Sequence, residues 1–281
     1  MQFFFDRITY IFDPLHHWWE HERMLRRLSF VLVLVFLAGM VGIELNRRGF
    51  MPAPLAGITP TNHFHAVNLA FSMVLILEVI SFIFTLPCSF SRSVGKQFEI
   101  LILILLRNSF KELSYFVEPI TVSDMMPIYK ILTDGFGALI IFMLLGLYYR
   151  LQPFRQKQTA LPADLYRFVA AKKGIALLIL AVFIGMGLNT IYNTAMGRPH
   201  IEFFPVFYTM LIFTDILVIL VSQCFRPTFH AVFRNSGYAL STLFIRLALA
   251  APPFYDVALG IASIVFAIGL TVAWTRIFTD S

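Results

Sequence analysis

The chain has 281 residues, of which 58% are hydrophobic, 16% are aromatic and only 14% are charged. Its mean hydropathy is +0.77, and soluble domains carry about 25% charged residues, so the composition excludes an ordinary water-soluble globule. The net charge of +6 does not indicate nucleic-acid binding. The charged residues cluster between apolar runs, where they orient a membrane protein and meet anionic lipid headgroups.

The first segment, 1–25, interleaves aromatic and charged residues. It contains Trp18 and Trp19, and tryptophan side chains prefer the depth of the lipid headgroups. The pattern predicts an amphipathic helix that lies in the membrane interface. We expect Trp18 and Trp19 to anchor it there.

Eight apolar runs follow, and most approach the 20 or so residues that a helix needs to cross about 30 Å of hydrocarbon. They are 27–46, 65–88, 96–116, 127–150, 171–192, 203–224, 235–251 and 254–276. The sequence therefore predicts an all-α integral membrane protein with about eight transmembrane helices, preceded by the interfacial helix.

Basic residues are concentrated on one side of the predicted membrane. They gather before the first span, in the connections after the second, fourth and sixth spans, and after the last span. The positive-inside rule then places both termini in the cytoplasm. We expect a multi-pass protein of the plasma membrane (the inner membrane, if the chain is bacterial). The expected partners are anionic lipids of the cytoplasmic leaflet, further copies of the chain or other membrane subunits, and no nucleic acid.

The second half of the chain resembles the first. Four spans of 26–150 align in order with four spans of 171–281, and the cytoplasmic linker 151–170 separates them. The matched polar positions are Arg26-Arg27 with Lys172-Lys173, His63 with His200, Glu78 with Asp215, Arg107 with Arg246, Tyr129 with Tyr255, and Arg150 with Arg276. Because each repeat has an even number of spans, both have the same orientation. The sequence predicts two parallel four-helix repeats, related by a pseudo-twofold axis along the membrane normal.

Each repeat carries one acid and one arginine within its apolar spans. Counted from the nearest cytoplasmic basic residue, Glu78, Arg107, Asp215 and Arg246 all lie roughly 16–21 Å deep. We therefore expect Glu78 to pair with Arg107, and Asp215 with Arg246, so that neither charge is alone in hydrocarbon. Two roles remain open. The pairs either fix the register of the helices or line a hydrated path and titrate during transport.

Asp134 breaks the symmetry of the repeat, because its counterpart is Gly260. A carboxylate present in one half only, inside the outer boundary of a span, is a candidate gate or ion site. The alternative is a pair with Lys130, four residues earlier on the same helix face.

His63 and His200 are equivalent in the repeat and begin the second and sixth spans. A pseudo-twofold axis could bring them together as ligands of a metal or a haem. The alternative is two interfacial histidines without a ligand, and on that interpretation we expect no cofactor.

The chain lacks the Gly-rich phosphate loop, the nucleophile elbow, the C-x-x-C pair and the zinc-protease helix, so we do not expect an enzyme. The expected function is transport, as a channel, carrier or permeation subunit for a small ion or polar solute. The alternative is a non-catalytic scaffold or sensor subunit of a larger complex, with segment 1–25 as its docking element. A cofactor-bearing redox subunit is a third possibility and depends on His63 and His200.

Overall fold

The computed structural model of the chain describes residues 2–52, 57, 59–87, 90–116, 125–152, 163–196, 203–225 and 229–277. All regular secondary structure in these ranges is helical. The elements are α1 (Gln2–Trp19), α2 (Glu22–Arg47), α4 (Phe64–Thr85), α5 (Phe90–Glu112), the 3-10 helix η1 (Leu113–Tyr115), α6 (Met126–Leu151), α7 (Ala163–Ala195), α8 (Phe203–Phe225), α9 (Phe229–Ala250) and α10 (Tyr255–Ile277).

Six of these helices are long and apolar enough to cross a bilayer, namely α2, α4, α6, α7, α8 and α10. This confirms the predicted all-α fold of the membrane type. Helices α5 and α9 are of similar length but are more polar, with basic residues such as Arg107 and Arg246 inside them. Length and composition alone therefore support six spans.

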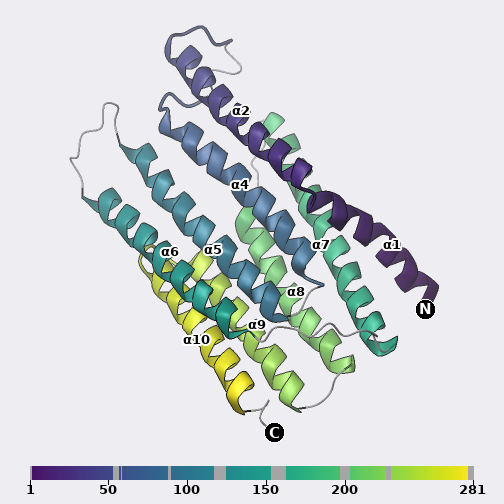
Figure 1. The fold of residues 1–281 in the computed structure, drawn as a ribbon. Coiled ribbons are helices and arrows are strands. Elements are labelled where there is room, and N and C mark those ends of the chain that lie inside the picture. Colours follow the sequence, from purple (N-terminus) through teal and green to yellow (C-terminus); the bar gives the residue numbers. More distant parts are fainter. Residues whose placement is uncertain are drawn as a thin grey trace.

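The helices form two rows that pack side by side. In the first row α2 contacts α4, α4 contacts α5, and α5 contacts α6. In the second row α7, α8, α9 and α10 contact one another in the same order, and the rows meet where α5 contacts α9 and α6 contacts α10. Figure 1 shows α5 between α4 and α6, with α2 on the outside. We call the end of the bundle where α4 ends and α5 begins the proximal end, and the opposite end the distal end.

Two apolar clusters hold the rows together. The first fills the space among α5, α6, α9 and α10. Helix α5 contributes Val94, Phe98, Leu101 and Leu105 to it, a spacing of three and four residues that keeps these side chains on one helix face. The second cluster joins α1, α4, α7 and α8, and α5 reaches it through Ile100 and Ile104. Helix α5 therefore lies between both clusters.

Glycines allow α6 and α10 to approach closely. A Cβ atom built on Gly137 would lie 2.4 Å from Val257, and one built on Gly260 would lie 2.9 Å from Ile141. Small residues at helix crossings let backbones come together in membranes. The contact between the two rows at this crossing therefore depends on the absence of side chains at Gly137 and Gly260.

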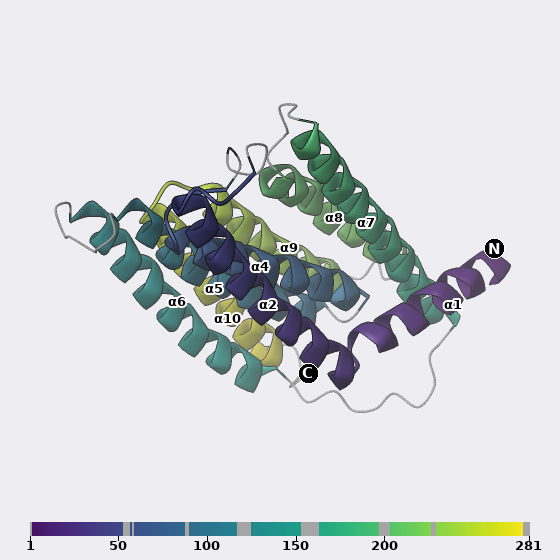
Figure 2. The same cartoon turned by 90° about the horizontal axis from the view of Figure 1, so that it is seen from above.

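Helix α1 packs along α7. Asp6 accepts a hydrogen bond of 2.6 Å from Tyr166, and Asp13 forms an ion pair of 2.6 Å with Lys173. Phe12 is only 3% exposed and belongs to the second apolar cluster. Figure 2 shows α1 leading away from α2 to the proximal part of α7. The predicted amphipathic helix is thus present, and one of its faces packs on the bundle.

The two predicted anchor residues differ in their surroundings. The Trp19 ring packs against Phe84 at the end of α4, with 5.9 Å between ring centroids. Trp18 is 58% exposed. Of the pair, Trp18 is therefore the side chain that is turned away from the bundle.

Four helices begin at least five residues earlier than the sequence predicts, and one of them is α2, which begins at Glu22 and not at 27. Helix α5 begins at Phe90 and not at 96, α9 begins at Phe229 and not at 235, and α7 begins at Ala163 and not at 171. The basic residues near these starts were interpreted as loop residues, yet they lie in the first turns of the helices. Part of the predicted linker 151–170 is consequently helical, and charged side chains lie deeper along their helices than expected.

Candidate functional site: a polar track through the bundle

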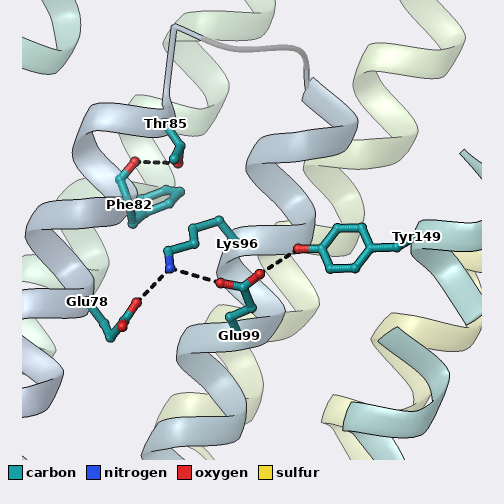
Figure 3. Close-up of polar contacts among 6 residues, drawn as sticks. All are labelled: Glu78, Phe82, Thr85, Lys96, Glu99 and Tyr149. Atoms are coloured by element: carbon teal, nitrogen blue, oxygen red, sulfur yellow. Dashed lines mark hydrogen bonds and ion pairs between the residues drawn. The ribbon is translucent and has the colours of Figure 1, made fainter. Parts of the chain in front are cut away.

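Glu78 pairs with a different residue from the one predicted. Its Oε2 atom forms an ion pair of 2.7 Å with Nζ of Lys96. Lys96 also contacts Glu99 at 2.8 Å, and Glu99 accepts a hydrogen bond of 2.7 Å from the Tyr149 hydroxyl. Figure 3 shows these four side chains linked in a row across α4, α5 and α6. The predicted ion pair between Glu78 and Arg107 is wrong.

The helix boundaries explain this correction. Glu78 lies seven residues before the end of α4 at Thr85, or about 10 Å along the helix axis. Lys96 lies six residues after the start of α5, or about 9 Å along its axis, whereas Arg107 lies 17 residues after that start, about 26 Å along it. The basic residue at the level of Glu78 is therefore Lys96.

The second predicted pair does not form a direct ion pair either. Asp215 and Arg246 attract each other electrostatically, but neither is in an ion pair with any residue that the structure describes. Nη2 of Arg246 instead donates a hydrogen bond of 3.0 Å to Oε1 of Gln97. Its guanidinium lies over the rings of Phe82 and Tyr208, at 5.7 and 6.0 Å from their centroids.

Both charges are enclosed and incompletely satisfied. Arg246 is 4% exposed, and its Nε atom is buried without a hydrogen-bond partner. The same holds for Oδ2 of Asp215. Buried polar groups are nearly always hydrogen-bonded, so an unsatisfied atom on each of two buried charged residues is unusual. Buried atoms without a hydrogen-bond partner occur also on Thr9, Asn68 and Glu78, of which Glu78 is in an ion pair with Lys96.

A small cavity adjoins Asp215 at the proximal side. It measures about 20 Å³ and is lined by residues of α5, α7, α8 and α9 that include Gln97, Lys172, Asp215 and Thr242. One water molecule needs about 10–15 Å³ by this measure, so the cavity has room for a single water. Lys172 is buried here and donates a hydrogen bond of 3.3 Å to the carbonyl oxygen of Pro87.

Further polar groups adjoin Arg246. Its guanidinium lies 6.0 Å from the centroid of the Tyr208 ring, and Tyr208 interacts electrostatically with both Arg246 and Arg107. Nε of Arg107 donates a hydrogen bond of 3.2 Å to Ser72, and Ser72 donates one of 2.7 Å to the carbonyl oxygen of Asn68. Arg107 and Arg246, which occupy equivalent positions in the two repeats, therefore both lie near Tyr208.

These groups form one continuous feature, which we call the polar track. It consists of Lys172, Gln97, Asp215, Thr242, Arg246, Tyr208, Arg107 and Ser72. It runs where α4 and α8 meet α5 and α9. Helices α5 and α9, which are too polar to be recognised as spans by composition, thus contribute several of their polar residues to the track.

Sequence reasoning identified Asp215, Arg246 and Arg107 as site residues. It missed five others of the track, namely Lys172, Gln97, Thr242, Tyr208 and Ser72. A signal for one of these was present. Tyr238, Thr242 and Arg246 recur every four residues, which places them on one face of α9. Gln97 and Tyr208 carry no comparable pattern, because a single polar residue in an apolar helix does not reveal which helix it faces.

Asp134 lies outside the track, on α6. It is 5% exposed and interacts electrostatically with Asp256, Glu112 and Lys130. Lys130 contacts Glu112 at 3.5 Å, and Asp134 forms no ion pair with any residue in the described ranges. The alternative pair between Asp134 and Lys130 is therefore not formed.

The predicted histidine pair is only partly described. Nε2 of His63 lies 3.3 Å from Oε2 of Glu44, whereas His200 lies outside the described residues. Within the ranges that the structure describes, no group of three or more His, Cys, Asp or Glu side chains is placed to hold a metal ion.

No protein-family model, no curated protein and no solved structure matches this chain. The proposals below therefore depend on the geometry of the polar track.

Proposed function

We propose that the protein is a transport protein, a channel, carrier or permeation subunit that moves a small ion or polar solute along the polar track. The observation that carries this proposal is the pair of enclosed charges, Arg246 and Asp215, each with an unsatisfied atom in the middle of an apolar bundle. Ionisable groups inside a membrane are expensive and commonly mark pathways for ions and solutes. A purely structural pair would be expected to satisfy itself.

We also propose that α5 and α9 cross the membrane, which gives eight spans in two parallel repeats. Three observations support this. Both helices are flanked by more apolar ones, α4 and α6 for α5, and α8 and α10 for α9. The order of neighbours is the same in both rows. Arg107 and Arg246 each lie 17 residues from the start of their helices, as the repeat requires.

Cysteine labelling tests whether α5 crosses. In a chain with Cys88 and Cys224 changed to serine, we expect Arg92→Cys to react with an impermeant maleimide only after the membrane is opened. Tyr115→Cys, 64% exposed at the other end of α5, should react in intact cells. Reaction of both from one side would show that α5 does not cross. Reaction of Tyr115→Cys from the cytoplasmic side alone would reverse the orientation that we propose.

In the proposed orientation the proximal end faces the cytoplasm of a plasma-membrane protein, with both termini on that side. Arg and Lys residues near the proximal ends of the helices then meet anionic lipids. Trp18, exposed on α1, would sit at headgroup depth and hold that helix at the surface. Among the helices, α1 thus provides the surface that lies along the lipid headgroups.

The track is closed in this conformation, because the cavity beside Asp215 has room for only one water. Transport therefore requires the helices around it to separate, as in the gating motions of other transport proteins. A bulky side chain at the cavity should block this step. Ala239 lines the cavity, and the next residue, Leu240, is exposed on the outer face of α9.

We expect purified protein in liposomes to conduct a small ion or polar solute, and Ala239→Phe to reduce the flux at least tenfold. Leu240→Phe, the matched control, should conduct like the unchanged protein. Gel filtration must first show that both variants are folded. A folded, unchanged protein that gives no flux of chloride, nitrate, acetate, potassium or glycerol would overturn the proposal. It would favour the scaffold alternative, with α1 as its docking element.

A further inference from the structure

We propose that Arg246, together with Arg107 and Tyr208, forms a binding site for a small oxyanion, a carboxylate or an anion of similar size such as nitrate. This inference identifies the chemical class of the solute. Transport of the anion rests on the function proposed above, whereas binding of the anion does not.

The charge of the polar track is positive. It contains three basic residues, Lys172, Arg246 and Arg107, and a single acid, Asp215. Glu78 and Glu99 belong to the separate group around Lys96, whereas Arg246 interacts electrostatically with Asp215 and Tyr208. A cation moving along the track would be repelled at three positions, whereas an anion would be attracted.

Arg246 retains an unused donor. Its Nη2 is held by Gln97, which fixes the plane of the guanidinium, while its Nε is buried without a partner. A guanidinium offers donors in a rigid fork that matches two oxygens of a carboxylate or a similar planar anion. An oxyanion can accept a directed hydrogen bond from this donor, and a spherical ion fits the same geometry less well.

The surroundings strengthen such an interaction. Phe82 and Tyr208 lie near the guanidinium and Arg246 is only 4% exposed, so the local attraction between opposite charges is stronger than in water. Arg107 also interacts electrostatically with Tyr208. An anion beside Tyr208 would therefore be within the field of both arginines.

Asp215 does not replace the anion. It attracts Arg246 from beyond ion-pair distance and leaves the Nε donor unused, and its own Oδ2 lacks a partner. An internal counter-charge that served only to neutralise Arg246 would be expected to contact it. The separation leaves the donors of Arg246 available to a second acceptor.

Thermal unfolding of the purified full-length chain in detergent tests the site. Sodium acetate and sodium nitrate should raise the midpoint temperature saturably by at least 2 °C, relative to equal concentrations of gluconate, which is too large to enter. Chloride should have a smaller effect. The Arg246→Gln variant should lose the response, and Arg234→Gln should keep it, because Arg234 stacks on Trp274 outside the track.

If Arg246→Gln fails to fold, Arg246→Lys provides the test, since it keeps the charge and lacks the fork. It should reduce the acetate response more than the chloride response. Equal shifts with acetate, nitrate, chloride and gluconate, or a response unchanged by both Arg246 variants, would overturn the inference.

Flux measurements on the same preparation separate this inference from the proposed function. Stabilisation by acetate that depends on Arg246, without flux of any solute, would support the site and refute transport. Flux of potassium or glycerol, without stabilisation by acetate or nitrate, would support transport and refute the anion site. We expect both stabilisation and flux with acetate or nitrate, and a loss of at least tenfold in that flux in Arg246→Gln.

Discussion

Replacing Lys96 with methionine should lower the free energy of unfolding by about 2–3 kcal/mol, somewhat below the 3–5 kcal/mol typical of a fully buried pair. Lys96 is the cation that contacts both Glu78 and Glu99. Without it, two carboxylates would face each other between α4 and α5 with no compensating charge. Because the side chains are 19–38% exposed, we expect less than the full effect of a buried pair. Unfolding in mixed detergent and denaturant would measure the change.

The single change Glu78→Gln should cost about 1 kcal/mol or less, since Lys96 keeps its contact with Glu99 and the net charge of the group falls to zero. The double change Glu78→Gln with Lys96→Met should be more stable than Lys96→Met alone, because one uncompensated acid has been removed. Lys111→Met, at an exposed position near the distal end of the same helix, serves as control and should be nearly neutral. A cost for Glu78→Gln equal to that of Lys96→Met would contradict this account.

Replacing Gly137 with leucine should prevent stable folding or cost about 3 kcal/mol or more, at the upper end of overpacking effects. Even the first side-chain atom would lie 2.4 Å from Val257, a branched and stiff side chain that has little room to turn. Helix α10 would have to move away from α6, which would open the first apolar cluster. The yield of monodisperse protein and its thermal midpoint measure the effect.

Gly146 offers a control on the same helix. It is exposed and no atom lies within 4 Å of a Cβ built there, so Gly146→Leu should be tolerated and should favour the helix slightly. Equal losses from Gly137→Leu and Gly146→Leu would mean that leucine harms α6 for a reason other than the crossing with α10.

The positions of the helices were largely predictable from the sequence, but their ends were not. Each predicted span overlaps a helix, because runs of apolar residues near 20 in length have few alternatives. The starts of α5 and α9 were misplaced because Arg92, Lys96 and Arg234 resemble loop residues when only hydropathy is considered. A basic residue in the first turns of a membrane helix can extend its side chain toward the interface, so charge alone does not end a helix.

That boundary error affected the predicted pairs directly. Depth counted from Arg92 or Lys96 treated those residues as the membrane surface, which placed Glu78 and Arg107 at one level. The described helix ends separate them by several turns. Asp215 and Arg246 could be identified from the sequence, because a single charged residue within an apolar run stands out without knowledge of its neighbours in space. Their actual neighbours, Gln97 and Tyr208, depend on how α5 and α8 rotate about their own axes, which the sequence does not encode locally.

The contact between α1 and α7 has a consequence for biosynthesis. Asp6 and Tyr166, and likewise Asp13 and Lys173, are 160 residues apart in the chain. At about 5–20 residues per second of translation, α1 waits roughly 8–32 s before its partner has been made. During that time Phe12 has no α7 to cover it, and it can lie only in the lipid interface or, once α4 has been made, against Phe84. The amphipathic pattern of segment 1–25 therefore suits two environments in succession. The first is the membrane surface while the chain is being made, and the second is the side of the finished bundle.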